Sequence, residues 1–189
     1  MKSIGIVGSP RKNGNTEIIT RHILKAISEE GIEAELIRLA GRDIRPCDAC
    51  TACRSGKICP IQDDLLPIYT QMKEADAIIL TSPVYYGSAT ALLKALMERT
   101  GHISRGDGEV FQGKIGGSFV VSRRSSHYFT QSQINFWFHV LGFFMPGSTH
   151  PNIAFGREKG DVENDKEGLS TAWNFGKNTA LLVKKLRAQ

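Results

Sequence analysis

Four short runs of strand length in this sequence alternate with segments of helical periodicity. The runs cover residues 3–8, 33–39, 77–81 and 115–121. The third is apolar almost throughout, as expected for a parallel strand that is buried on both faces. Between the first two runs, apolar residues recur at helical spacing, as at Ile19, Ile23 and Ile27. This alternation predicts an α/β fold, a doubly wound five-stranded parallel sheet with helices on both faces.

The length of 189 residues suits a single domain, spanning 1–189, with a full hydrophobic core. A hydrophobic content of 41% argues against a disordered chain. No apolar stretch approaches membrane-spanning length, and the run 4–7 is too short for the core of a signal peptide. We therefore expect a cytoplasmic protein with no membrane partner.

The net charge of +5 raises the question of a nucleic-acid partner. Lysines and arginines are interspersed with acidic residues, and the sequence has neither a basic run nor an aromatic-interleaved RNA motif. A solvated surface accounts for most of this charge, and we expect no nucleic-acid partner. A bound phosphate would balance part of the positive excess.

A polar loop, residues 9–16, follows the first apolar run directly and leads into a helix. This arrangement suits a phosphate, because N–H groups of the loop and the first helical turn converge on an anion and the helix dipole favours it. The loop matches neither the dinucleotide fingerprint nor the P-loop pattern. A helix cap with incidental polar residues is the alternative. The candidate ligands are Ser9, Arg11, Asn13, Asn15 and Thr16.

Two further loops follow the third and fourth apolar runs and so reach the same edge of the predicted sheet. The first is rich in aromatic residues and could flank a flat ring, although its tyrosines could also simply cover the sheet edge. The second carries cationic and hydroxyl groups that would stabilise an anionic reduced ring. The candidate residues are Pro83, Val84, Tyr85, Tyr86 and Gly87 in the first loop, and Ser122 and Arg124 in the second.

All four cysteines lie in one short segment after the second run, spaced Cys-x2-Cys-x2-Cys-x5-Cys and followed by Pro60. This is close to the bacterial ferredoxin run, which also ends in Cys-Pro. Structural zinc usually takes two short pairs separated by a longer insert, which this segment lacks. The spacing favours a [4Fe-4S] cluster; unmetallated thiols, zinc and disulfides are the alternatives. The candidate ligands are Cys47, Cys50, Cys53 and Cys59.

The segment 134–144 is too apolar all round for a simple surface helix. Core burial, a subunit interface or both would account for it, and we expect a homodimer or homotetramer. The sequence has no evident Ser-His or His-carboxylate arrangement, so we assign no catalytic side chain. His127 and His139 are expected to be structural.

On these motifs the chain resembles the iron-sulfur flavoproteins, a branch of the NAD(P)H-dependent FMN reductase family with a flavodoxin-like fold. The family's phosphate loop corresponds to Gly8 to Arg11 with Asn15-Thr16, its cysteine motif to the four cysteines, and its flavin loop to Pro83 to Tyr85. The resemblance covers nearly the whole chain. Relatives often have Arg-x-Gly-Gly after the fourth strand, where this chain has Arg124-Ser125-Ser126.

The resemblance implies FMN, with its phosphate on the first loop and its isoalloxazine ring against residues 83–87 and the loop at Ser122. It also implies a [4Fe-4S] cluster on the cysteines. Such a protein is a flavin-dependent oxidoreductase that links a two-electron flavin step to one-electron carriers. Its partners would be a redox protein such as ferredoxin, or NAD(P)H, and a small electron acceptor. The alternatives are a clusterless NAD(P)H-dependent FMN or quinone reductase and a flavin-binding redox sensor with reversible disulfides.

Overall fold

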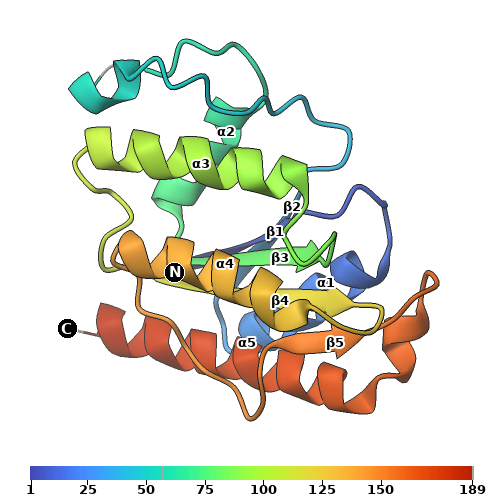
Figure 1. The fold of residues 1–189 in the computed structure, drawn as a ribbon. Coiled ribbons are helices and arrows are strands. Elements are labelled where there is room, and N and C mark those ends of the chain that lie inside the picture. Colours follow the sequence, from blue (N-terminus) through green and yellow to red (C-terminus); the bar gives the residue numbers. More distant parts are fainter. Residues whose placement is uncertain (57, 189) are drawn as a thin grey trace.

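The computed structural model describes residues 1–56 and 58–188. Its five parallel strands form one sheet in the order β2–β1–β3–β4–β5 (Figure 1). The predicted five-stranded, doubly wound parallel sheet is therefore confirmed. The strands are β1 (Lys2–Val7), β2 (Glu33–Arg38), β3 (Ala77–Pro83), β4 (Ile115–Ser122) and β5 (Ile153–Phe155).

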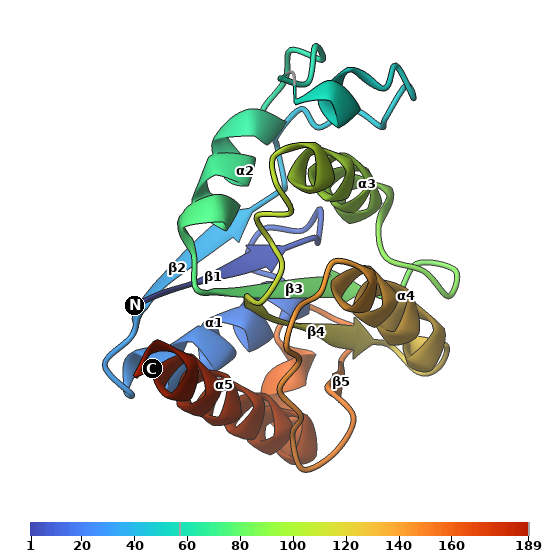
Figure 2. The same ribbon diagram turned by 90° about the vertical axis from the view of Figure 1, so that its left-hand side faces the viewer.

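Helices cover both faces of this sheet (Figures 1 and 2). On one face lie α1 (Asn15–Ser28) and α5 (Lys166–Arg187), which pack against each other. On the other face lie α2 (Leu65–Glu74), α3 (Ala91–Gly106) and α4 (His127–Val140). Two short 3-10 helices complete the described elements, η1 (Ala52–Ser55) and η2 (Asp161–Asn164).

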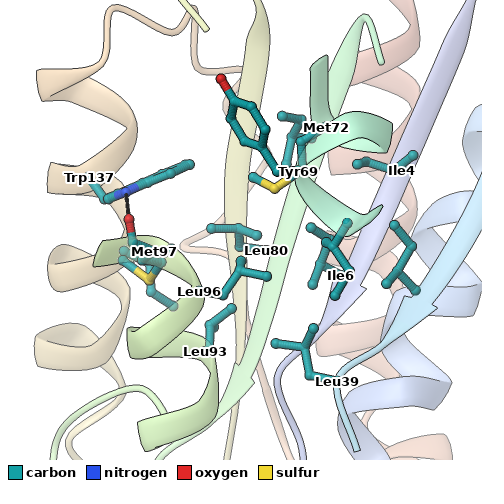
Figure 3. Close-up of a cluster of buried hydrophobic side chains, with 14 of the residues drawn as sticks. Ile4, Ile6, Leu39, Tyr69, Met72, Leu80, Leu93, Leu96, Met97 and Trp137 are labelled. Carbon is teal, nitrogen blue, oxygen red and sulfur yellow. Dashed lines mark hydrogen bonds between the residues drawn. The ribbon is translucent and has the colours of Figure 1, made fainter. Parts of the chain in front are cut away.

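The sheet separates two hydrophobic cores because strand side chains point alternately to opposite faces. Under α2, α3 and α4, Ile6 and Leu80 of the sheet are fully buried together with Leu96. Figure 3 shows this core, in which Trp137 Nε1 donates a hydrogen bond of 2.7 Å to the carbonyl of Met97. That bond satisfies the indole N–H inside an otherwise apolar cluster.

The predicted apolar segment 134–144 is divided between core and surface. Residues 134–140 belong to α4, which begins at His127, earlier than the apolar pattern suggested, and residues 141–144 follow the helix. Trp137 and Phe138 are buried, whereas Phe136 keeps 66% of its surface exposed and Phe144 keeps 51%. Core burial therefore explains part of the segment and leaves an aromatic surface.

No helix in the described part of the chain is both long and apolar enough to span a membrane.

The order of the strands determines where the chain can bind a ligand. From β1 the chain moves outward to β2 and then returns to β3 on the other side of β1. Loops that leave the carboxyl ends of β1 and β3 therefore turn to opposite faces of the sheet and leave a crevice between them, the usual ligand site of open parallel sheets.

Candidate functional site

A pocket of about 360 Å³ lies at the carboxyl ends of β1, β3 and β4. It lies beside the point where the strand order reverses, and its volume is within the range of small-molecule sites. Loops after four of the strands contribute to its wall. The lining residues are Ser9, Arg11, Gly14, Asn15, Thr16, Pro83, Val84, Tyr85, Val121, Arg123, Gly156, Arg157, Glu158 and Lys159.

The loop after β1 forms the cationic end of this pocket. Gly8 follows β1 directly, and a Cβ there would lie 2.8 Å from the Cβ of Leu93, so the close approach of this loop to α3 requires glycine. The buried hydroxyl of Ser9 accepts the backbone N–H of Arg11 at 3.1 Å. Gly14 then occupies the N-cap of α1 beside the pocket. An anion bound there would meet the positive end of the α1 dipole and the Arg11 side chain.

A buried carboxylate anchors this loop from within the protein. Asn13 has a left-handed φ of 53°, and its backbone N–H donates to Glu17 Oε2 at 2.9 Å. Arg38 and Arg21 donate to the same carboxylate at 2.7–3.0 Å. With the hydrogen bond from Arg38 as the largest cause, these donors lower the pKa of Glu17 from 4.5 to about 2. Glu17 thus links the loop to α1 and β2.

Glu17→Gln should destabilise the protein at neutral pH much more than at low pH. The native carboxylate stabilises the fold above its ordinary pKa of 4.5, and this contribution is lost as the pH falls toward about 2. A shift of that size corresponds to at most about 3 kcal/mol. Urea unfolding at pH 7 and pH 3 measures the difference between variant and native protein. We expect the difference in free energy of unfolding between variant and native protein to be smaller at pH 3 than at pH 7.

Glu30→Gln is the matched control. The pKa of Glu30 is also lowered to about 2, by Lys177 and Lys184, but its side chain is 34% exposed, where solvent weakens ion pairs. We expect Glu30→Gln to lower the free energy of unfolding at pH 7 much less than Glu17→Gln does. Equal effects of the two variants, or a Glu17→Gln effect that does not depend on pH, would contradict the anchoring role.

A tight hairpin after β3 forms the opposite wall. Tyr85 and Ser88 exchange backbone hydrogen bonds of 2.9 and 3.0 Å, and Tyr86 and Gly87 between them have φ values of 51° and 76°. Positive φ at both central residues is the pattern of a type I′ turn. Tyr85 lines the pocket, whereas Tyr86 is fully exposed at the tip.

Thr90 connects this wall to the loop after β1. Its hydroxyl donates to the carbonyl of Gly8 at 2.6 Å and accepts the N–H of Leu93 at 3.2 Å, which caps α3. Because one side chain bonds both to the end of β1 and to the start of α3, the two walls are held in fixed relation.

A third wall, the loop 156–160 after β5, was missed in the sequence. The Asn15 amide donates to the carbonyl of Glu158 at 2.7 Å and accepts the N–H of Gly160 at 2.8 Å. A Cβ on Gly156 would lie 2.6 Å from Asn15 Nδ2, so this contact requires glycine. The loop adds Arg157 and Lys159 to the pocket lining. The feature of the sequence that could have indicated this wall is Gly156, followed by the cations Arg157 and Lys159 in a charged segment.

The twelve predicted cofactor-binding residues are only partly brought together. Ser9, Arg11, Asn15, Thr16, Pro83, Val84 and Tyr85 line the pocket. Five others lie outside the described lining, namely Asn13, Tyr86, Gly87, Ser122 and Arg124.

Among these five, Ser122 is the last residue of β4, and its side chain bonds to the turn that follows. Its hydroxyl donates to the carbonyl of Ser125 at 2.9 Å and accepts the N–H of Arg124 at 3.2 Å. Arg123, not Arg124, lines the pocket. Nearby, the ring of His127 packs against those of Tyr128 and Phe155, with centroids 4.3 and 5.3 Å away.

The cysteine segment follows β2 and rests on α3. All four thiols are free; Cys59 is buried, Cys47 and Cys53 are half-buried, and Cys50 is exposed. Burial is the main cause that raises the pKa of the Cys53 thiol, and the charges of the other three cysteines add to it. All four thiols belong to one short segment, residues 47–59.

The donor chemistry of this segment fits an iron-sulfur cluster, which is held by four cysteine thiolates. Among the described residues, however, no three candidate ligands are gathered closely enough to hold a metal ion. The segment is thus an open arrangement of the right donors, in which a cluster would require the outer cysteines to close inward.

These features define a class of protein. An open parallel sheet with a cationic, helix-ended pocket at its strand-order switch is typical of α/β proteins that bind a nucleotide-like phosphate.

Comparisons with known proteins identify the family. The family model for NADPH-dependent FMN reductase matches residues 1–158. An iron-sulfur flavoprotein of Methanocaldococcus jannaschii is 43% identical over 196 residues, covering 99% of this chain and 100% of that protein. An iron-sulfur flavoprotein of Methanosarcina thermophila is 36% identical over 174 residues, covering 90% of this chain and 89% of that protein. A solved flavodoxin from the domain Archaea has a TM-score of 0.65 at 18% identity, covering 97% of this chain and 99% of that one.

The chain belongs to the NADPH-dependent FMN reductase family, in the branch of the iron-sulfur flavoproteins. Its fold is flavodoxin-like, as the resemblance implied. It is a flavin-dependent oxidoreductase of the electron-transfer type, and FMN is the cofactor of its family.

Proposed function

We propose that the protein binds FMN in the pocket at the strand-order switch and a [4Fe-4S] cluster on Cys47, Cys50, Cys53 and Cys59. Bound FMN would supply two-electron chemistry and the cluster one-electron chemistry, so that together they connect a hydride or two-electron donor to one-electron carriers. The observation that carries the proposal is the pocket itself, which combines cations from the loops after β1, β4 and β5, the N-terminus of α1 and a wall of Pro83 to Tyr85.

The residues of the pocket divide between the two ends of FMN. Ser9, Arg11 and Thr16, with the N-terminus of α1, suit the phosphate, because a guanidinium and helix amides recognise phosphate oxygens. Pro83 to Tyr85 provide a flat apolar wall for the isoalloxazine ring. On the far side, Arg123 supplies positive charge that would favour an anionic reduced ring.

The cluster rests on two kinds of support. Relatives that match nearly the whole chain carry the name iron-sulfur flavoprotein. In this chain, all four cysteines are free and lie within one short segment. Free thiols persist in a reducing compartment, so we place the protein in the cytoplasm. A ferredoxin-like protein or NAD(P)H would be its redox partner, together with a small electron acceptor.

A clusterless NAD(P)H-dependent FMN or quinone reductase is the second candidate. It is favoured by the open arrangement of the cysteines, in which no three described ligands converge. The family model for NADPH-dependent FMN reductase agrees with either candidate.

Anaerobic reductive titration separates the two candidates. If FMN and the cluster are both present, the protein should take up two electrons for the flavin and one more for the cluster, with visible bleaching beyond that of flavin. Uptake of only two electrons, with a pure flavin spectrum, would favour the clusterless reductase.

The exposed aromatic side chains of α4 support the proposed homodimer or homotetramer. Phe129, Phe136 and Val140 are 74%, 66% and 41% exposed and recur at helical spacing along one side of the helix. The helix contains no Lys, Arg, Asp or Glu. Depletion of charge together with aromatic enrichment is typical of the centre of a subunit interface.

Phe136→Glu should therefore convert the oligomer into monomers, because it places a charge at the centre of the apolar face. Light scattering coupled to size exclusion measures the mass. Leu181→Glu is the control, since Leu181 is a comparably exposed residue, at 52%, on α5. A monomeric native protein, or equal effects of the two variants, would contradict this interface.

A further inference from the structure

Arg99, on α3, is an arginine buried almost completely inside the protein. Only 1% of its side chain is exposed. It forms an ion pair with the Asp63 carboxylate, which is itself inaccessible to solvent. Burying a charge costs free energy unless the charge is paired and hydrogen-bonded. The contacts that compensate for burying this guanidinium therefore indicate what it does.

The partners of Arg99 lie on both sides of the cysteine segment. Its Nη1 donates to the carbonyl of Arg45 at 3.1 Å, just before the first cysteine. Its Nη2 donates to the carbonyl of Ile61 at 3.4 Å and to the sulfur of Cys59 at 3.3 Å. One side chain therefore holds together the chain entering and the chain leaving the cysteine segment.

Asp63 also connects the two ends of the cysteine segment. Its carboxylate accepts the backbone N–H of Arg45 at 2.9 Å and that of Leu65 at 3.1 Å, where α2 begins. The Arg99–Asp63 pair thus joins α3, the start of α2 and both ends of the segment in one buried network.

The tip of the segment rests on the same helix, two turns further on. A Cβ at Gly106 would overlap the carbonyl oxygen of Cys53, so only glycine allows this contact. Gly106 follows Arg99 by seven residues and so lies on the same face of α3. The helix is therefore a platform, with Arg99 under the base of the segment and Gly106 under its tip.

We propose that Arg99 is the positioning residue of the cysteine site. It holds Cys59 in place as the inner ligand of the cluster, and the three more accessible cysteines complete the site. The N–H that it donates to the Cys59 sulfur raises the reduction potential of the cluster. The inference rests on the proposed function. A hydrogen bond and a positive charge at a ligand sulfur stabilise the more negative reduced cluster. Burial of Cys59 and exposure of Cys50 agree with this division between inner and outer ligands.

The same network could instead serve only the stability of the fold, and the variants are chosen to separate these roles. Arg99→Lys keeps a positive charge for Asp63, but a single ammonium cannot reproduce the guanidinium fork that reaches Cys59 and both backbone carbonyls. The double variant Arg99→Met, Asp63→Asn removes both buried charges, which is usually tolerated better than leaving one of them unpaired. Arg105→Met is the control, an exposed arginine on the same helix.

Two measurements on the anaerobically purified holoprotein test the proposal. Amide hydrogen exchange of residues 45–63 should be at least about tenfold faster in Arg99→Lys and in the double variant, because the base of the segment loses charge-assisted hydrogen bonds. The one-electron midpoint potential of the cluster should be about 59 mV more negative in both variants, which corresponds to a tenfold change in the equilibrium constant for reduction. The control should match the native protein in both measurements, and FMN content should be unchanged throughout.

Each contrary result has a distinct meaning. Native-like exchange of residues 45–63 in both variants would overturn the positioning role, whether or not iron is present. Faster exchange with an unchanged midpoint would overturn the effect on the cluster and leave Arg99 as a structural residue. Loss of FMN from both variants would show that Arg99 supports the whole fold, and would also overturn the proposal. A native protein without iron would defeat the cluster assignment and the tuning role, while the exchange comparison would still decide the positioning role.

Discussion

Replacing Arg11 with alanine should raise the dissociation constant for FMN at least about tenfold. Arg11 lines the cationic end of the pocket beside the N-terminus of α1 and is exposed, so it is free to contact a phosphate. A charge-assisted hydrogen bond of this kind contributes about 1.5 to 3 kcal/mol, which corresponds to a tenfold or larger loss of affinity. Fluorescence titration of the apoprotein with FMN measures the change.

Lys12→Ala is the matched control for Arg11→Ala. Lys12 is the adjacent cation in the same loop and is equally exposed, but it lines a separate depression together with Arg38 and Arg42. Its loss should change FMN affinity little. If Arg11→Ala binds FMN as the native protein does, or if both variants lose affinity equally, the assignment of Arg11 to the phosphate is wrong.

Replacing Cys59 with serine should remove or degrade the cluster while leaving FMN bound. The cysteines follow β2, whereas the phosphate loop follows β1 and the ring loop follows β3, so loss of one sulfur leaves the flavin pocket intact. A serine hydroxyl is a poor substitute for a thiolate ligand of iron. The variant should be yellow from flavin, still reducible by two electrons, and deficient in one-electron delivery. Iron and sulfide analysis with visible spectroscopy measures this outcome.

Ser55→Ala controls for a general disturbance of the cysteine segment. Ser55 lies among the cysteines, and its hydroxyl donates to the nearby carbonyl of Ala52, at 2.9 Å. This variant should keep the cluster. If Cys59→Ser keeps the full iron-sulfur spectrum and one-electron activity, Cys59 is not a ligand.

Most of the sheet was predictable because four of its strands are runs of strand length, each followed by a loop and then by a segment of helical periodicity or a motif. The fifth strand, β5, has only three residues, of which Ala154 alone is fully buried, so it leaves no recognisable run in the sequence. The beginning of α4 was missed for a similar reason. Its first turns expose Tyr128 and Phe129 and contain several polar residues, so the apolar pattern becomes evident only from Ile134.

The pocket was predictable only where its walls follow a recognisable strand. The polar loop after β1 and the aromatic loop after β3 follow apolar runs, and residues of both line the pocket. The third wall depends on Asn15, whose amide meets residues 143 and 145 positions away. Glu17 and Arg99 were missed as well, because a carboxylate or guanidinium on an amphipathic helix gives no sign in sequence that distant partners bury it. Such contacts are created by the fold and have no local pattern.

The central claim is that one chain carries both FMN and a cluster, and an anaerobic absorption spectrum with flavin, iron and sulfide counts tests it most directly. We expect flavin bands superimposed on broad iron-sulfur absorption, with one FMN and one [4Fe-4S] cluster per chain. Flavin without iron or sulfide in anaerobically purified protein would contradict the cluster and replace it with the clusterless FMN reductase. Iron without flavin would contradict the assignment of the pocket.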